Sequence, residues 1–96
     1  MKNDKKIKIG SYWRVKYGKY SGVVKVRKKH KHQEPYGESY ICQISEEAHL
    51  TKYRKNIFAV KDFVAESSEK QFLIEAIATM LFNLNFLNKK IGLINE

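Results

Sequence analysis

The sequence has few of the residues that build covalent or metal-linked scaffolds. Its single cysteine, Cys42, excludes an intramolecular disulfide, and there is only one proline. A lone cysteine suits a reducing compartment, so we predict a cytoplasmic protein in which this thiol is buried and inert. There are 3 histidines. His30 and His32 have no second short-spaced ligand pair beside them, and cations surround them, so we predict no metal site and no cofactor.

Acidic residues are also scarce, and they are unevenly placed. The 96 residues hold 19 Lys and Arg against 10 Asp and Glu, a net charge of +9. Residues 1–61 contain 16 of the basic residues and five acids, net +11, whereas residues 62–96 contain three basic residues and five acids, net −2. Clustered cations release counterions from phosphate groups, so the first part is expected to bind a polyanion.

One long apolar run is present, but it does not resemble a membrane span. Residues 72–88 are nearly long enough to cross a bilayer, yet they include Glu75 and three asparagines, which are unfavourable there. The basic start of the chain has no apolar stretch behind it, which predicts no secretory signal. We therefore expect no membrane partner.

Alternation of apolar and polar residues predicts a hairpin near the start of the chain. Trp13, Val15 and Tyr17 fall on one face of a first strand. A turn with two glycines follows at residues 17–22, and a second alternating strand runs from Val23 to Lys29.

Further strands and one helix complete the predicted domain. Residues 39–44, residues 52–60 and a short segment after residue 61 read as strands, and residues 30–38 read as a loop. Ser68 and Gln71 have the spacing of a capping box, which predicts a helix over residues 69–90 with Gly92 at its end. We predict a mainly β fold with a C-terminal helix.

This prediction covers residues 1–96 as a single domain. Residues 1–6 form a mobile basic N-terminus, residues 7–65 a small antiparallel barrel of four to five strands, and residues 68–91 the helix segment.

Residues 9–26 resemble a known type of small domain. Ile9-Gly10, the strand 13–15, the turn 17–22 with its two glycines and the Val/Lys-rich strand after it are similar to a KOW-type segment of an SH3-like barrel. Proteins of that type bind RNA, DNA or protein in ribosomal and transcription settings. The resemblance implies an SH3-like barrel and a binding function.

The densest cationic cluster lies on the second strand and the loop after it. Lys25, Arg27 and Lys29 share a face at a period of two, which predicts a row of charges for a phosphate backbone. Nearby tyrosines could stack on bases, which favours RNA or single-stranded DNA over duplex. The alternative is a solvated strand face with tyrosines at the core rim. The residues predicted to contact nucleic acid are Arg14, Lys16, Lys19, Tyr20, Lys25, Arg27, Lys28, Lys29, Lys31, Tyr36, Arg54 and Lys55.

No catalytic constellation is recognisable, so we predict that the protein is not an enzyme. A nucleophile needs a base and an orienting group in contact with it, and Cys42 shares its strand parity with the apolar Tyr40 and Ile44. There is also no glycine-rich phosphate loop.

The helix is more apolar than a single contact face requires. Leu73, Ile77, Met80, Leu84, Leu87 and Ile91 follow a 4-3-4-3-4 spacing, and further apolar residues widen this seam. A helix of about 33 Å should overhang a small barrel. We predict a homodimer or a protein partner bound through Met80, Phe82, Leu84, Phe86, Leu87 and Ile91, with an intramolecular core as the alternative.

Two functions fit this pattern. The first is a non-enzymatic nucleic-acid-binding module that holds RNA or single-stranded DNA mainly by its backbone. The alternative is a small inhibitor or adaptor of phage or mobile-element origin. It would dock on a host protein or nucleoprotein through the basic face and the helix. Fold alone does not decide between them.

Overall fold

The computed structural model describes residues 6–30 and 37–92. The predicted mobile N-terminus at residues 1–6 falls almost wholly outside this part of the chain, as do Lys31 and Tyr36.

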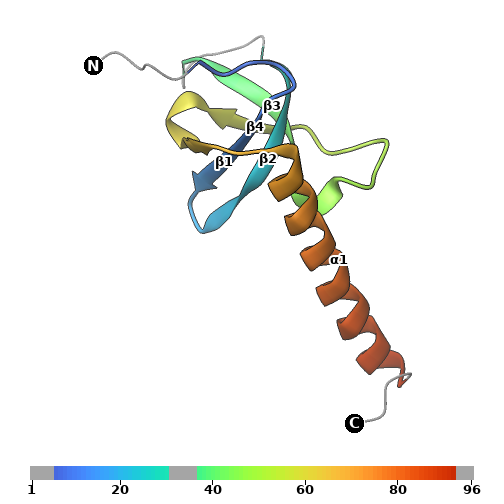
Figure 1. Ribbon diagram of the computed structural model, residues 1–96. Helices are drawn as coiled ribbons and strands as arrows, with labels where there is room; N and C mark the ends of the chain where they lie inside the picture. Colours follow the sequence, from blue (N-terminus) through green and yellow to red (C-terminus); the bar gives the residue numbers. More distant parts are fainter. Residues whose placement is uncertain (1–5, 31–36, 93–96) are drawn as a thin grey trace.

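Five antiparallel strands form one curled sheet, a half-barrel, with a single long helix projecting from it (Figure 1). The strands are β1 (Tyr12–Tyr17), β2 (Tyr20–Lys29), β3 (Ser39–Ile44), β4 (Asn56–Ala59) and β5 (Phe63–Glu66). Their order in the sheet is β4-β3-β2-β1-β5. Two single-turn helices, η1 (Ser45–Glu47) and η2 (Val60–Asp62), interrupt the connections. The predicted mainly β fold with a C-terminal helix is confirmed.

The concave face of the sheet holds the core, and the alternation in β1 to β3 explains why. Trp13 and Val15 of β1 pack with Val24 and Val26 of β2, and Cys42 of β3 lies among them. The remaining members of the core are Tyr40, Ile44, Phe58 and Phe63. Trp13 meets Phe63 edge to face at 5.8 Å between ring centroids, an arrangement that aromatic pairs favour.

The register of β2 shifts halfway along the strand, and this corrects one prediction. Lys25 pairs with Gln43 and Val26 with Cys42, but the next pair is Lys28 with Ile41. Arg27 is therefore the extra residue of a β-bulge. After the bulge, Lys29 lies opposite the core residue Tyr40. The prediction of one row formed by Lys25, Arg27 and Lys29 is wrong, because strand parity changes at the bulge.

Helix α1 (Glu69–Ile91) begins and ends close to where the sequence predicts. The Ser68 hydroxyl oxygen accepts a hydrogen bond from the Gln71 backbone N–H at 3.1 Å. The Gln71 side chain turns to Glu75 instead of back to the N-cap, so only half of the capping box forms. Gly92 ends the helix at φ 78°, a conformation that favours glycine.

Only the first turns of α1 are attached to the barrel. Phe72 and Ala76 are buried, and Phe72 contacts the Tyr12 ring at 5.2 Å. Beyond them the helix runs free of the barrel, giving extents of 55 × 25 × 23 Å (Figure 1). The radius of gyration is 15.8 Å, against about 12–13 Å for a compact chain of this length. The predicted overhang of the helix is therefore present.

Candidate nucleic-acid interface

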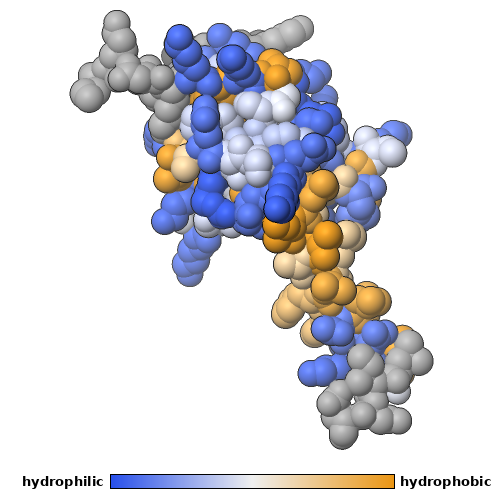
Figure 2. Space-filling view, viewed as in Figure 1, coloured by the Kyte–Doolittle hydropathy of each residue, from blue (hydrophilic) through white to orange (hydrophobic). Residues whose placement is uncertain are grey.

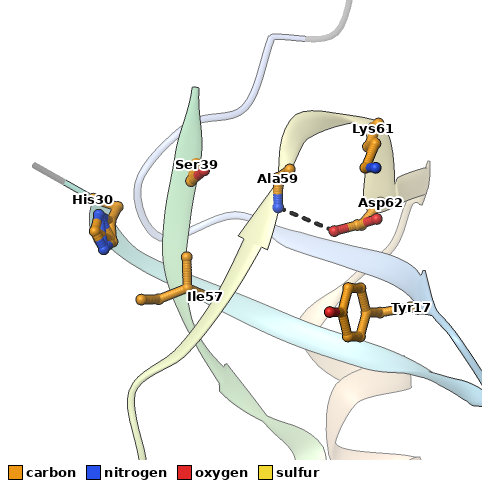
Figure 3. Close-up of a pocket in the computed structure, with 7 residues that line it drawn as sticks. All are labelled: Tyr17, His30, Ser39, Ile57, Ala59, Lys61 and Asp62. Carbon is orange, nitrogen blue, oxygen red and sulfur yellow. Dashed lines mark hydrogen bonds between the residues drawn. The ribbon is translucent and has the colours of Figure 1, made fainter. Parts of the chain in front are cut away.

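Two adjoining pockets lie along strand β4 and share Tyr17 and Ile57. The larger, about 440 Å³, is lined by Tyr17, His30, Ser39, Ile57, Ala59, Lys61 and Asp62 (Figure 3). The smaller, about 300 Å³, is lined by Tyr17, Tyr20, Ile44, Arg54, Asn56, Ile57 and Phe58. We call the two together the Tyr17 groove. Their volumes match the lower range of small-ligand pockets.

Tyr17 enters this groove because β1 ends there. Its parity matches Trp13 and Val15, yet it lies beyond the core, and 64% of its surface is exposed. Across the two-residue turn Gly18-Lys19 it pairs with Tyr20, whose ring stacks on Phe58 at 6.1 Å. Tyr20 thus forms a packed wall, and Tyr17 is the aromatic ring that a ligand can reach.

Two polar side chains of the larger pocket are hydrogen-bonded within the fold, and a third, that of Lys61, is exposed. The Asp62 carboxylate accepts from the Ala59 N–H at 3.1 Å, and the Ser39 hydroxyl donates to the Gly37 carbonyl oxygen at 3.1 Å. These two groups hold the chain in place. Lys61, by contrast, is exposed at the rim, where Figure 3 draws it beside Asp62 and above Tyr17.

All three arginines predicted to bind nucleic acid have structural partners. Arg14 forms an ion pair with Glu75 of α1, and Arg54 one with Glu47 at 2.7 Å. The Arg27 guanidinium donates to the Gln43 side-chain oxygen and lies 5.0 Å from the centroid of the Tyr53 ring. Their first role is therefore to join elements of this fold.

The predicted lysines fall into two groups. Lys16 and Lys19 are exposed at the tip of the β1–β2 hairpin, where they flank Tyr17 in the sequence. Lys16 precedes Tyr17 in β1 and therefore projects from the opposite face of the strand. Farther along β2, Lys25 lies 5.7 Å from the Tyr12 ring centroid, Lys28 is exposed, and Lys29 is 3.8 Å from Glu38. Lys55 is exposed beside β4, while Lys31 and Tyr36 lie outside the described residues.

The groove also contains residues that the sequence did not single out. The sequence pattern places Tyr17 on the face of Trp13 and Val15 and among the tyrosines near the cationic cluster, but not among the predicted contact residues. Lys61 and Ile57 belong to no predicted site. These three residues come together because η2 and β4 fold toward the end of β1. The periodicity of the sequence does not predict such a tertiary contact. The available signal was the position of Tyr17 between Lys16 and the Gly18-Lys19 turn.

Two tyrosines and the cysteine are shielded from solvent. Burial, together with Glu46, raises the pKa of Tyr20, and burial with the Glu38 hydrogen bond raises the pKa of Tyr40 to about 12. Burial also raises the pKa of the Cys42 thiol to about 12, so this group stays protonated at neutral pH. The predicted buried thiol is confirmed.

Within residues 6–30 and 37–92, no three His, Cys, Asp or Glu side chains are grouped to hold a metal ion. In the same part of the chain, no helix is both long and apolar enough to cross a membrane.

A second surface lies on α1, where large apolar side chains cover the projecting part of the helix (Figure 2). All six predicted interface residues are exposed, from 40% for Met80 to 71% for Phe82. The alternative of an intramolecular core is wrong for this half of the helix, since the barrel covers only Phe72 and Ala76 fully.

Comparisons with protein-family models, curated proteins and solved structures find no match to this chain. The resemblance of residues 9–26 to KOW-type segments stays a prediction, and the hairpin on which it rests is present as β1 and β2.

Proposed function

We propose that the chain is a non-enzymatic nucleic-acid-binding protein that holds single-stranded RNA or DNA along the Tyr17 groove. The observation that carries the proposal is an exposed tyrosine ring in a groove that Lys61 also lines, on a barrel of strong positive charge. Bases stack on such rings without regard to sequence, and lysines hold the phosphates on either side.

The residues of the groove have different roles in binding a single strand. Tyr17 supplies a face for one base, and Ile57, half exposed, supplies an apolar wall beside it. Lys61 lines the groove beside the ring, and the exposed Lys16 and Lys19 at the hairpin tip neutralise phosphates where the strand leaves the groove. Duplex is disfavoured because its bases are stacked inside and no described helix carries a cationic face for the major groove.

The apolar surface of α1 has a separate role, which is to join two copies of the chain. A surface of this size on a helix would otherwise remain in water, which is unfavourable. The single buried thiol suits work in the cytoplasm.

A second candidate is a small inhibitor or adaptor, of the kind found in phages and mobile elements, that docks on a host protein. The observation in its favour is the same exposed face of α1. Salt separates the two functions, because phosphate binding weakens steeply with ionic strength and an apolar helix contact does not.

The test is a fluorescence titration with labelled single-stranded RNA, single-stranded DNA and duplex of the same mixed sequence. Tyr17→Ala should lower single-strand affinity by about 5- to 150-fold, equivalent to about 1–3 kcal/mol of stacking. Tyr17→Phe keeps the ring and should bind like the wild type. Equal affinity of Tyr17→Ala and wild type, or tighter binding of the duplex, would reject the groove as the site.

A further inference from the structure

One line of α1 is exposed from end to end. Leu73, Ile77, Met80, Leu84, Leu87 and Ile91, the seam, are each between 40% and 67% exposed. They stay exposed even in the first turns, next to the barrel.

The seam and the barrel contact use different sides of the helix. At about 100° per residue, the seam is centred roughly 80° around the helix from the buried Phe72 and Ala76. A second helix can therefore lie along the seam without displacing the barrel. Phe82 and Phe86, two of the six residues that the sequence predicts at the interface, project away from the seam, and Phe82 lies on the opposite side. Pairing along the seam therefore leaves these two residues outside the contact.

The spacing of the seam is the same in both directions. Counting 4-3-4-3-4 from Leu73 or back from Ile91 gives the same positions, with the midpoint at residue 82. Two antiparallel copies centred there place Leu73 opposite Ile91, Ile77 opposite Leu87, and Met80 opposite Leu84. Every seam residue then meets a seam residue of the partner, as a self-complementary two-fold interface requires.

We infer that two copies of α1 pair antiparallel about a two-fold axis at the level of residue 82, with the two barrels at opposite ends. The inference rests on the homodimer of the proposed function, and adds its orientation.

Charge decides between this arrangement and a parallel one. Parallel helices 8–10 Å apart would bring together two barrels that are each about 25 Å across and carry net +11 over residues 1–61. Antiparallel pairing separates the barrels along a seam of about 27 Å, well beyond the roughly 8 Å screening length at physiological salt.

The size of the surface fits a second copy. With the flanking Ile74 and Leu81, which are also exposed, this face offers on the order of 800 Å² per copy, close to what each partner of a standard stable interface buries.

Association is tested first, by sedimentation at micromolar concentration. The wild type should be a dimer and Leu84→Glu a monomer that keeps its fold by circular dichroism. Phe82→Glu is the matched control, because Phe82 is more exposed than Leu84 but lies off the seam. It should remain a dimer. A monomeric wild type, or loss of the dimer only in Phe82→Glu, would overturn the pairing.

Orientation is tested by disulfide trapping with Met80→Cys and Leu84→Cys chains of different size. Cys42 is buried and serves as the internal control, since wild type should form no cross-link. Antiparallel pairing brings residue 80 of one chain to residue 84 of the other, so a mixture should give mainly the mixed disulfide. Leu84→Cys alone should cross-link poorly, because its two thiols lie a helical turn apart, beyond disulfide reach.

Efficient cross-linking of Leu84→Cys with itself would show a parallel pair and overturn the inference while leaving the homodimer intact. Nucleic-acid affinity is measured separately at the Tyr17 groove, so failure of binding and failure of pairing are distinguished.

Discussion

Replacing Glu75 with Ala is expected to loosen α1 from the barrel, because one carboxylate makes three contacts at their junction. It pairs with Arg14 of β1, accepts from the Val23 backbone N–H at 3.1 Å, and accepts from the Gln71 side chain at 3.1 Å. Val23 lies one residue before β2 begins to pair with β3. The carboxylate thus takes the place of a strand acceptor where the ladder ends.

The magnitude follows from these contacts. Val23 is fully buried, and leaving a buried N–H without its acceptor costs about 1–3 kcal/mol. The partly exposed ion pair with Arg14 adds up to about 1 kcal/mol. We expect Glu75→Ala to lower the free energy of unfolding by about 1–4 kcal/mol. Glu75→Gln keeps an acceptor for Val23 and should lose only about 1 kcal/mol.

The same carboxylate makes stability depend on pH. Partial burial acts to raise the pKa of Glu75, but hydrogen bonds from Gln71, Arg14 and the Val23 N–H outweigh it and lower the pKa from its ordinary 4.5. Because the pKa of Glu75 is lower in the folded than in the unfolded chain, the ionised carboxylate stabilises the fold above pH 4.5. This stabilisation is lost as the pH falls through the folded-state pKa. The pKa of Glu47 is lowered too, first by the Arg54 backbone N–H. Because Glu75→Gln removes the titrating carboxylate of residue 75, this variant should lose less stability than the wild type when the pH is lowered from neutral to acid.

Urea unfolding followed by Trp13 fluorescence measures the stability, and amide hydrogen exchange reports the contact itself. The Val23 amide should lose protection in Glu75→Ala and retain it in Glu75→Gln. Unfolding free energy within about 0.5 kcal/mol of wild type, the range of a neutral surface change, with Val23 still protected, would refute this account of the junction.

Two further predictions concern buried groups of the barrel. Arg27→Met should destabilise the fold by about 1–3 kcal/mol in urea, because the oxygen of the 2%-exposed Gln43 loses its donor; an unchanged midpoint would contradict a structural role for Arg27. Cys42 should fail to react with a thiol reagent at pH 8 in the native protein and react fully in concentrated guanidinium, since burial raises its pKa to about 12; rapid native labelling would contradict its burial.

Local patterns predicted the elements that depend on neighbours in sequence. Period-two alternation places Trp13, Val15, Val24 and Val26 in the core as observed. The N-cap at Ser68 and the left-handed Gly92 bound the helix within a residue of the predicted end. The fourth strand is shorter than the predicted 52–60, running only from Asn56 to Ala59.

The candidate site was harder to predict, because its geometry depends on distant partners. Arg14 is occupied by Glu75, 61 residues away, and Arg27 by Gln43, 16 residues away. Neither pairing changes the alternation of apolar and polar residues in the sequence, so the sequence alone predicts that both arginines are available to phosphate. The bulge at Arg27 is set by the register between β2 and β3, and it moves Lys29 off the predicted row. Charge composition indicated the ligand class without locating the groove.

The most direct test of nucleic-acid binding at the Tyr17 groove compares two charge-matched triple variants. Lys61 lines the groove and Lys16 and Lys19 are exposed at the hairpin tip that carries Tyr17, whereas Lys25, Lys28 and Lys29 lie along β2. Replacing either set with Glu changes the charge by −2 per site, from +9 to +3. Arg27 is kept in both because it supports Gln43.

The measurement is the affinity for single-stranded RNA as a function of salt, with urea midpoints checked for both variants. The groove variant should lose most of the affinity, and its log–log salt slope should fall by about 2, the value for three phosphate contacts on a single strand. The β2 variant should keep a slope close to wild type. Equal losses in the two variants, or a larger loss in the β2 variant, would contradict binding at the Tyr17 groove.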